Sequence, residues 1–385
     1  MRQNQSARSI EAAPDRELTV LILPKYTRRA ASSRLRCYQY LPLLGRFGIR
    51  AKVVPLLDDE YIVALYSGVR TPITTIVHGY LKRLDACWSA GGADLVWIER
   101  DLLPWVPAFA EGFLTRRWRV PYVVDIDDAV FHGYDRHNNW LVRRILGNKI
   151  DRLMAGSSAV FAGNRYLAER AAAAGAKQVI DLPTVVDLDK YALAANRSDV
   201  LTIGWIGTPI TAKYLEGAFH EALASLTRKC HFRMVIVGAN HPGWTDVPVE
   251  TAPWDERSER DVVAGFDIGV MPLCDGPFER GKCGYKLIQY LSAGVPVVAS
   301  PVGVNCEIVK PGVNGFLAGS AEEWITALEL LCGSSELRSQ MRSRCRNSVL
   351  QFGLRENARK LAERLWNIAG HERAPQCYVE LHQGN

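Results

Sequence analysis

Short apolar runs alternate with longer amphipathic segments along most of this chain. The runs are rich in Val, Ile, Leu and aromatic residues, and each is too short to form a helix that crosses a core. Continuous apolar runs separated by helical segments predict parallel sheets that helices cover on both faces. We therefore expect strands at residues 18–24, 51–56, 94–100, 121–127, 159–164, 201–207, 232–238, 266–273 and 295–300.

A change of pattern divides these strands into two series. Residues 181–199 mix Pro, Asp and Asn without a sustained period, which is typical of a link between domains. A chain of 385 residues is also long for a single core. The expected fold class is α/β, with two doubly wound Rossmann-like domains whose parallel sheets face a central cleft, where such sheets bind ligands.

The domain boundaries follow from the same pattern. Residues 17–190 are predicted to form the N-terminal domain and residues 200–353 the C-terminal domain. Residues 354–370 place apolar side chains at helical spacing, and we expect this helix to pack back on the N-terminal domain. Residues 1–16 are expected to be disordered, and residues 371–385 to form a loosely ordered tail.

Composition and charge narrow the class of protein. The net charge of +6 is modest for this length and does not indicate a nucleic-acid-binding protein. No window approaches the roughly 20 apolar residues of a membrane span, and the N-terminus lacks the apolar region of a signal peptide. Nine cysteines without CxxC pairs and eight histidines favour neither a disulfide framework nor a metal site, so a cytoplasmic location is expected.

The first loop, residues 25–36, carries five basic residues and no acidic one. Ser32 or Ser33 is expected to cap a helix that runs to about Phe47, with Arg34 and Arg36 in or near its first turn. Cations there oppose the helix dipole, which suggests an anionic ligand. A solvated basic face is an equally good interpretation of the charge alone.

The second series of strands begins with a turn that suits a phosphate. A strand runs into Gly207, Thr211 is expected to cap the next helix, and Lys213 adds a positive charge. Ile206 and Pro209 break the GxGxxG fingerprint, so a dinucleotide site is weakly supported. A purely structural turn remains the alternative.

Residues 274–286 form a glycine-containing loop that leads from a buried strand into a helix. It holds Lys282, and Lys286 lies in the first helical turns with Gln289 three positions on, on the same face. A cation at a helix start is unfavourable unless an anion lies beside it, and a diphosphate meets this need. Lysines that only make the surface soluble are the alternative.

Carboxylates follow two strands of the first series. Asp125, Asp127 and Asp128 come at the end of the strand at 121–127, where they could orient a sugar hydroxyl, accept a proton or cap a helix. Glu99, Arg100 and Asp101 end the strand at 94–100, where an internal ion pair is as good an interpretation as catalysis.

Several stretches together resemble a known family. They are "GWIGTPITAK", "RMVIVG", "FDIGVMPL", "GYKLIQYLSAGVPVVASPVGVNCEIVKPGVNGFLA" and, in the first half, "ASSRLRCYQYLPLL" and "VVDIDDAVF". From about residue 18 to 370 the sequence resembles the family 4 glycosyltransferases of the GT-B fold, which are retaining enzymes with nucleotide-sugar donors. The first-half stretches are similar to a bacterial polysaccharide-synthesis branch.

The resemblance implies a binding site for the nucleotide-sugar donor in the second half. We call residues 274–286 the donor loop. The family's phosphate-binding lysine falls on Lys213, Lys286 matches the lysine of one branch, and Gln289 and Gly281 stand where the family has glutamates. An arginine of the family is replaced by Thr208. The implied donor-binding residues are Gly207, Thr208, Lys213, Lys282, Gly284, Tyr285, Lys286 and Gln289.

In the first half, Asp127 and Asp128 stand where many relatives have a His-Asp pair, so a histidine role does not transfer. Together with Lys213 and Lys286 they are the residues expected at the reaction centre. The residues expected to contact the acceptor or line the cleft are Lys25, Ser33, Arg34, Glu99 and Arg100.

The function that the resemblance implies is transfer of a sugar from a UDP- or GDP-sugar to a glycan or lipid-linked glycan acceptor, with retention, in cell-surface polysaccharide synthesis. No cofactor or metal is expected. Two alternatives stay open: a sugar-nucleotide 2-epimerase and a non-catalytic partner that binds the nucleotide-sugar. Contact with the inner face of a membrane is a further expectation, through the first loop and residues 113–122, where Arg116, Arg117 and Arg119 flank Trp118, with a solvated helix as the alternative.

Overall fold

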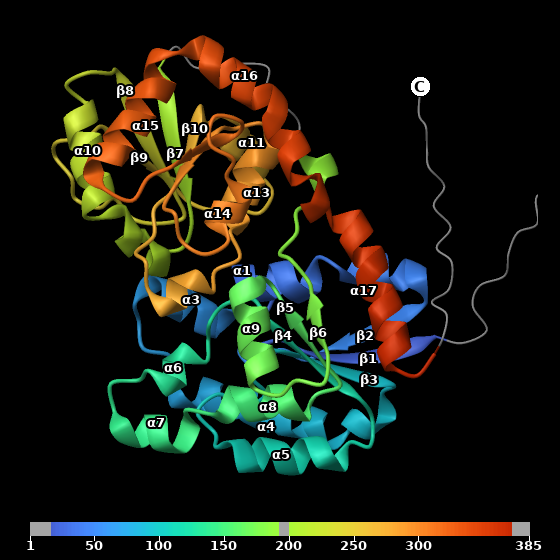
Figure 1. The fold of residues 1–385 in the computed structure, drawn as a ribbon. Helices are drawn as coiled ribbons and strands as arrows, with labels where there is room; N and C mark the ends of the chain where they lie inside the picture. The colour runs from blue at the N-terminus through green and yellow to red at the C-terminus, as the bar shows by residue number, and fades with distance from the viewer. Residues whose placement is uncertain (1–16, 192–199, 372–385) are drawn as a thin grey trace, which may run out of the picture.

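The structure, a computed structural model, describes residues 17–191 and 200–371. The tail expected at 1–16, most of the tail expected at 371–385 and part of the expected linker lie outside the described residues. Two six-stranded sheets, each with all its strand pairs parallel, form two domains that lie one above the other in Figure 1. The predicted α/β class with two doubly wound domains is confirmed.

The N-terminal sheet has the strand order β2-β1-β3-β4-β5-β6. Its strands are β1 (Leu18–Leu23), β2 (Ile49–Val53), β3 (Leu95–Glu99), β4 (Tyr122–Ile126), β5 (Ala159–Ala162) and β6 (Val179–Asp181). Its helices are α1 (Ala31–Ser33), α2 (Leu41–Leu44), α3 (Asp59–Ser67), α4 (Ile73–Trp88), α5 (Ala108–Arg117), α6 (His132–Asp135), α7 (Trp140–Leu146), α8 (Lys149–Gly156) and α9 (Arg165–Ala173).

Helices cover both faces of this sheet because successive strand residues point to opposite sides. Leu21 and Leu23 pack into a core with α4, α5, α8 and α9, whereas Val20 and Ile22 pack into a second core with α2 and the last helix of the chain. Five of the six strands lie in the segments that the apolar runs predict. The sixth, β6, was missed because it is short and half-exposed at the sheet edge.

The C-terminal sheet has the strand order β12-β11-β10-β7-β8-β9. Its strands are β7 (Leu201–Ile206), β8 (Phe232–Val237), β9 (Val249–Ala252), β10 (Ile268–Met271), β11 (Val297–Ala299) and β12 (Gly315–Leu317). Its helices are α10 (Ala218–Leu226), α11 (Glu259–Ala264), α12 (Pro277–Arg280), α13 (Tyr285–Ser292), α14 (Asn305–Ile308), α15 (Ala321–Gly333) and α16 (Ser335–Cys345). The run analysis missed β9, an edge strand without a buried residue, and indicated β12 only through the resemblance.

The chain passes between the two domains twice, once after β6 and once before the last helix. After β6 the chain packs rather than running free, because Leu182, Val185 and Val186 of the expected linker are buried. Val186 then pairs with the start of the last helix, α17 (Leu354–Ile368), by accepting a hydrogen bond from the amide of Leu354.

The helix α17 covers one face of the N-terminal sheet (Figure 1), where its apolar side pairs with β1 and α2. Its Trp366 indole donates a hydrogen bond to the Phe47 carbonyl, 2.9 Å away. The chain therefore ends its described part on the domain in which it began. No described helix is long and apolar enough to cross a membrane, and the eight cysteines in the described ranges are all free thiols.

Candidate active site between the two domains

The topology brings one edge of each sheet to the boundary between the domains. In the N-terminal sheet the strand order reverses between β1 and β3, and in the C-terminal sheet it reverses between β7 and β10. Ligands of such sheets bind beyond the carboxyl ends of the strands at these reversals. The residues that follow those strands include Lys25, Arg100, Gly207 and, after β10, the donor loop, so the predicted site residues come from the favoured positions.

The donor loop is fixed directly on the N-terminal domain. Asn164, at the end of β5, donates hydrogen bonds to the carbonyl oxygens of Gly281 (2.9 Å) and Lys282 (3.0 Å). The Cys283 thiol donates to the Asp127 carbonyl at 2.9 Å. A side chain at Gly281 has no room, because its Cβ would lie 2.7 Å from the backbone nitrogen of Ala129. The absence of an acid at position 281 therefore follows from close packing of the two domains.

Arg100 organises the carboxylates at the boundary. Its Nε donates to Asp127 Oδ1 at 2.9 Å, and its Nη2 reaches Asp127 Oδ2 at 3.2 Å and Asp128 Oδ2 at 3.1 Å. Arg100 holds a left-handed backbone conformation with φ of 68°, which a non-glycine residue adopts only when its surroundings impose it. From the other domain, Lys282 Nζ lies 3.7 Å from Asp128 Oδ1, so one network of charges spans the boundary.

The two carboxylates of this network have different acidities. Burial opposes ionisation of Asp127, but the Arg100 guanidinium and its hydrogen bonds outweigh it and hold the pKa of Asp127 below its ordinary value. Burial raises the pKa of Asp128 above its ordinary value even though Lys282, Arg100 and Lys286 oppose the rise. Neither carboxylate caps α6, which begins only at His132 without a side-chain cap. The capping alternative for these residues is therefore wrong.

Two more cations from the C-terminal domain lie near this network. Lys286 Nζ lies 5.5 Å from the centre of the Trp205 ring, and the same ring would be 2.5 Å from a Cβ at Gly207. Lys213 Nζ lies 5.0 Å and Lys282 Nζ 6.0 Å from the centre of the Tyr214 ring. The structure thus brings Gly207 near Lys286, and Lys213 near Lys282.

Burial and the nearby charge of Lys282 lower the pKa of Lys286 to about 8, although Asp128 opposes this shift. Lys286 lies in the first turn of α13, after Gly284 at the N-cap with φ of 67°. A Cβ at Gly284 would also lie 2.5 Å from Ile308 Cδ1, so only glycine fits this turn. The first turn of α13 therefore holds a lysine with a lowered pKa, and this turn contains no acidic residue to compensate its charge.

The turn after β7 differs from the expected one. Thr208, not Thr211, is the N-cap, and the two form a capping box in which the Thr208 amide donates to Thr211 Oγ1 at 3.1 Å. The helix that begins here, Pro209–Leu215, is a 3-10 helix, and Lys213 lies in its last turn. The predicted cap was wrong because Pro209 starts the helix three residues earlier than the pattern indicated.

Two of the predicted donor residues face away from this network. Gln289 is buried and its amide donates to the Tyr191 hydroxyl at 2.9 Å. The Tyr285 hydroxyl is hydrogen-bonded to the same tyrosine, which also contacts Glu259. The Gln289 side chain is therefore not free to bind a ligand in this arrangement. The expected contact with a ribose requires that its hydrogen bond to Tyr191 breaks.

The first loop is neutralised by acids rather than left for a ligand. Arg34 Nη2 lies 3.6 Å from Glu259 Oε2, and its guanidinium stacks 4.4 Å from the centre of the Trp254 ring. Arg28 pairs with Glu256 at 2.6 Å. Both arginines thus contact acids of the C-terminal domain, which accounts for part of the basic excess of residues 25–36 without an anionic ligand.

Glu99 fastens the start of the same loop. It accepts hydrogen bonds from the Lys25 amide (3.0 Å) and the Ser33 hydroxyl (2.5 Å), and both Glu99 and Ser33 are fully buried. Ser33 therefore does not cap a helix: α1 begins at Ala31 without a side-chain cap and continues into a π-helical turn. Burial raises the pKa of Glu99 although Arg100, 3.8 Å away, opposes the shift.

Two carboxylates of the sequence analysis point into the N-terminal core. Asp125 pairs with the fully buried Arg36, whose Nε lies 3.1 Å from Asp125 Oδ1, so neither lines the cleft. Asp101 accepts a hydrogen bond from the Tyr134 hydroxyl at 2.7 Å and lies 3.5 Å from Lys149 Nζ. For Asp101 the ion-pair interpretation is the one that the structure bears out.

Some residues at the boundary were not found from the sequence. Tyr214 donates a hydrogen bond to Glu279 at 2.5 Å between the two lysines that it contacts, and Asn164 and Cys283 hold the donor loop. Tyr191 lies in the segment taken as a linker. A signal for Asn164 was present, because it is the last residue of the strand predicted at 159–164 and a residue type that caps helices, and in the structure it accepts a capping hydrogen bond from the Leu167 amide.

Comparisons with known proteins match this geometry. A family model described as "Glycosyl transferases group 1" matches residues 197–334, which include β7, the turn at Thr208, the donor loop and α13. The similarity to this family lies in the C-terminal domain. This match covers less than half of the chain and none of the N-terminal sheet.

A Bacillus subtilis (strain 168) protein named as a teichuronic acid biosynthesis glycosyltransferase, TuaH, is 29% identical over 86 residues. That match spans 22% of this chain and 22% of TuaH, so it covers only about a fifth of the curated relative.

Solved structures cover nearly the whole chain. Anabaena HepE in complex with UDP-glucose matches 91% of this chain and all of its own, with a TM-score of 0.65 and 15% identity. Sucrose-phosphate synthase from Thermosynechococcus elongatus matches 91% of this chain and 99% of its own, with a TM-score of 0.70 and 13% identity. At these identities the likeness shows the fold, which is GT-B.

Proposed function

We propose that this protein is a retaining glycosyltransferase of family 4 that moves a sugar from a UDP- or GDP-sugar to a glycan or lipid-linked glycan acceptor in cell-surface polysaccharide synthesis. One observation carries the proposal: the donor loop places Lys282 3.7 Å from Asp128 of the other domain, which Arg100 also binds, and the charge of Lys286 acts on the same carboxylate. A nucleotide diphosphate brings negative charge for these two lysines to bind. The UDP-glucose complex of HepE and the name of TuaH support the donor and the pathway.

The donor diphosphate is proposed to lie at the start of α13. Lys286 and Lys282 bear the charge that develops on the phosphate as the sugar leaves, and Lys213 reaches it from the turn after β7. Gly207, Thr208, Gly284 and Tyr285 shape this side of the site. Because these cations and the helix start carry the charge, the reaction is expected to proceed without a metal or another cofactor.

The transfer itself exchanges one bond for another at the anomeric carbon. The bond between that carbon and the phosphate oxygen breaks, and the acceptor hydroxyl oxygen bonds to the carbon from the same face. The hydroxyl proton passes to the departing phosphate oxygen, so no protein nucleophile is required. The site needs to stabilise an oxocarbenium-like sugar and the leaving diphosphate at the same time.

The two carboxylates have separate roles in this scheme. Asp127 stays ionised and fixes Arg100, as its low pKa and two hydrogen bonds require. Asp128 is the more exposed of the two and is shared between Arg100 and Lys282, so it is proposed to orient the acceptor or the sugar. Lys25 lies at the mouth of the first loop on the acceptor side. Ser33 and Glu99 act on the site only by holding that loop.

A thermal-shift panel of UDP-, GDP- and dTDP-sugars tests donor binding, since a ligand that binds the native state raises the melting temperature. We expect one nucleotide to stabilise the protein and its sugar to be transferred in an acceptor extract, with nucleotide release. NMR of the product then gives the anomeric configuration. Inversion at the anomeric carbon contradicts the retaining assignment, and the absence of nucleotide release with every donor contradicts the activity.

A non-catalytic binding partner is the second candidate, and one observation favours it. Positions 281 and 289 lack the acids that the resemblance implies; Gly281 is closed off by Ala129, and Gln289 is held by Tyr191. Tight donor binding without turnover in a lysate that supplies acceptors supports this candidate over the transferase. Conversion of a UDP-sugar in the absence of any acceptor, seen by NMR, instead identifies an epimerase.

A further inference from the structure

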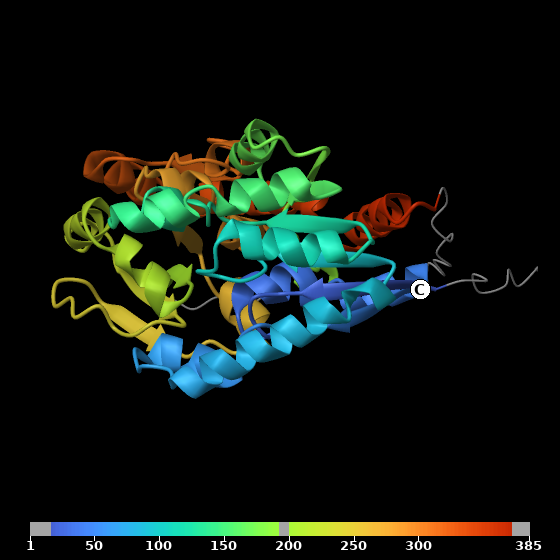
Figure 2. The ribbon, with the colours of Figure 1, turned by 90° about the horizontal axis from the view of Figure 1, so that it is seen from below.

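The outward face of α4 is apolar although it is exposed to solvent. Five apolar side chains recur along this 16-residue helix at intervals of three or four residues and are 40 to 71% exposed. They are Ile73, Val77, Leu81, Leu84 and Trp88. A surface helix normally carries polar residues on this side. In Figure 2, α4 (light blue) runs along the outer edge of the N-terminal domain.

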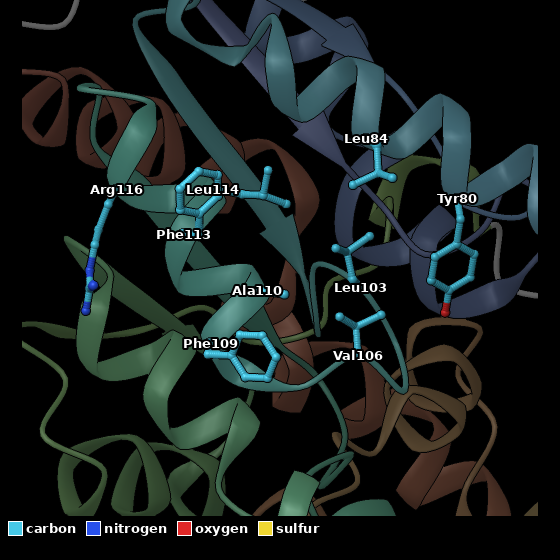
Figure 3. A pocket seen from close by; sticks show the side chains of 9 residues that line it. All are labelled: Tyr80, Leu84, Leu103, Val106, Phe109, Ala110, Phe113, Leu114 and Arg116. Carbon is cyan, nitrogen blue, oxygen red and sulfur yellow. The ribbon is translucent and has the colours of Figure 1, made fainter.

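The neighbouring helix α5 extends this apolar surface. Phe109 and Phe113, one turn apart, are 76% and 67% exposed. Between α4 and α5 lies an open hollow of about 690 Å³, and Figure 3 shows Leu84 and Tyr80 from α4 on one side of Leu103 and Val106, with the phenylalanines on the other. The walls are almost wholly apolar, so the hollow suits hydrocarbon rather than a polar ligand.

Basic side chains surround the apolar face. From Gly68 to Val120 the exposed charged residues are five basic and one acidic: Arg70, Lys82, Arg116, Arg117 and Arg119, against Asp85. The Arg117 guanidinium stacks 4.1 Å from the centre of the Trp88 ring, which joins the ends of α4 and α5. Trp118, expected to touch a membrane, is buried and donates to the Cys87 carbonyl at 2.7 Å, so the surface is made by other residues.

We propose that the face formed by α4 and α5, with this basic rim, seats in the interfacial layer of an anionic phospholipid bilayer. A helix of 16 residues is about 24 Å long, and an exposed apolar stripe with Trp, Phe and flanking Arg is the arrangement that lies in the headgroup region. The hollow between the helices takes an acyl chain. The arginines and Lys82 meet the negative surface potential of the lipid headgroups.

The charge of this surface favours an anionic bilayer over a second copy of the chain as its binding partner. Two such faces placed together would oppose five cations to five, with one acid on each side, and like charges across an interface are unfavourable. The surface also differs from the first loop, in which Arg28, Arg34 and Arg36 pair with acids within the molecule. It lies apart from the donor loop, so its lipid binding does not depend on the sugar transfer proposed above.

Vesicle sedimentation with the full chain tests the proposal. We expect co-sedimentation with vesicles of mixed phosphatidylcholine and phosphatidylglycerol, at least about tenfold weaker binding to phosphatidylcholine alone, and further loss in added salt. Leu81→Ser/Phe113→Ser is expected to reduce binding about tenfold or more by removing exposed apolar area, and Arg116→Gln/Arg119→Gln by removing charge.

A matched control is Leu330→Ser/Leu350→Ser, which changes two similarly exposed leucines of the other domain and its connection to α17 and should leave vesicle binding unchanged. Melting temperature and the thermal shift with UDP are measured for every variant. An unchanged UDP shift in Leu81→Ser/Phe113→Ser separates the lipid surface from the donor site. Equal binding to neutral and anionic vesicles overturns the proposal. So does a wild-type dimer, seen by sedimentation velocity, that this double variant dissociates while no vesicle is bound.

Discussion

The first loop and the donor loop are both clusters of cations beside a helix start, but different groups neutralise them. Arg36 pairs with Asp125 inside the N-terminal core, and Arg34 pairs with Glu259 across the boundary. In the donor loop, Lys282 and Lys286 share one carboxylate, Asp128, and Arg100 competes for it. Three arginines of the first loop therefore each pair with an acid of their own, whereas the two lysines of the donor loop act on a single shared carboxylate.

The chemistry of the two basic side chains matches this division. A guanidinium is planar and presents paired donors, so it suits a fixed partner such as the Asp125 carboxylate or the Trp254 ring. An ammonium group is a compact charge whose pKa shifts on burial, and Lys286 shows this shift. Arg28 and Arg34 thus pair with acids across the domain boundary, and the donor-loop lysines are the residues that we propose to meet a charged ligand.

The largest expected effect tests the buried half of this comparison. Arg36→Met leaves the Asp125 carboxylate buried with its charge uncompensated, and we expect the free energy of unfolding to fall by about 3–5 kcal/mol. Urea unfolding followed by tryptophan fluorescence and circular dichroism measures the loss in the N-terminal domain. The variant Arg36→Met/Asp125→Leu removes the stranded charge and should recover most of the stability. A single variant as stable as the wild type would show that the pair is not what holds these elements together.

The second prediction concerns the donor loop. Lys286→Ala removes a cation whose charge acts on Asp128. It is expected to lower kcat by about 100-fold, since a donor to the developing charge is lost. Lys310→Ala, an exposed lysine of the same domain, is the matched control and should keep full activity. Initial rates of nucleotide release, with melting temperatures for both variants, give the result. Similar rates for the two variants would remove Lys286 from the reaction centre.

The layout of the fold was predictable because parallel strands buried on both faces are continuous apolar runs. Nine strands lie where these runs predict them, and β6 and β9 escape because edge strands are short and partly polar. The packing of α17 on β1 depends on contacts between the two ends of the chain, yet its apolar stripe already indicated a buried face.

The position of the candidate site in the fold was predictable, but the side-chain contacts within it were not. Arg100, Asp127 and the turn at Gly207 were candidates because they lie at the carboxyl ends of predicted strands. The topology fixes where those ends meet. Which acid each cation contacts depends on the other domain, and no local pattern records that Arg34 meets Glu259 or that Gln289 meets Tyr191. The cap expected at Ser33 was wrong for the same reason: its hydroxyl is taken by Glu99, 66 residues away in sequence.

The third prediction uses the titration of Lys286. Its pKa of about 8 in the free protein means that this lysine is mostly protonated at pH 7 and mostly neutral at pH 9. A bound diphosphate favours the protonated form of Lys286. The affinity for UDP is therefore highest at pH 7 and below, and it falls as the pH rises through 8, by about tenfold between pH 7 and pH 9. Isothermal titration with UDP at constant ionic strength measures this. Lys286→Arg, which stays charged, should give a flat profile, and an equally steep profile in that variant would assign the titration to another group.

The smallest effect is expected at the exposed end of the first loop. Arg28 and Glu256 are 2.6 Å apart, but their side chains are 48% and 41% exposed, and solvent screens such a pair. Arg28→Ala should therefore change the free energy of unfolding by less than about 1 kcal/mol, and added salt should reduce even that difference. Arg34→Ala is the informative partner, since Arg34 is buried between Glu259 and Trp254, and its loss strands an acid that is also bonded to Tyr191. If urea unfolding shows equal losses for the two variants, the boundary is held by general charge attraction. A larger loss for Arg34→Ala alone shows that the buried pair is what joins the first loop to the C-terminal domain.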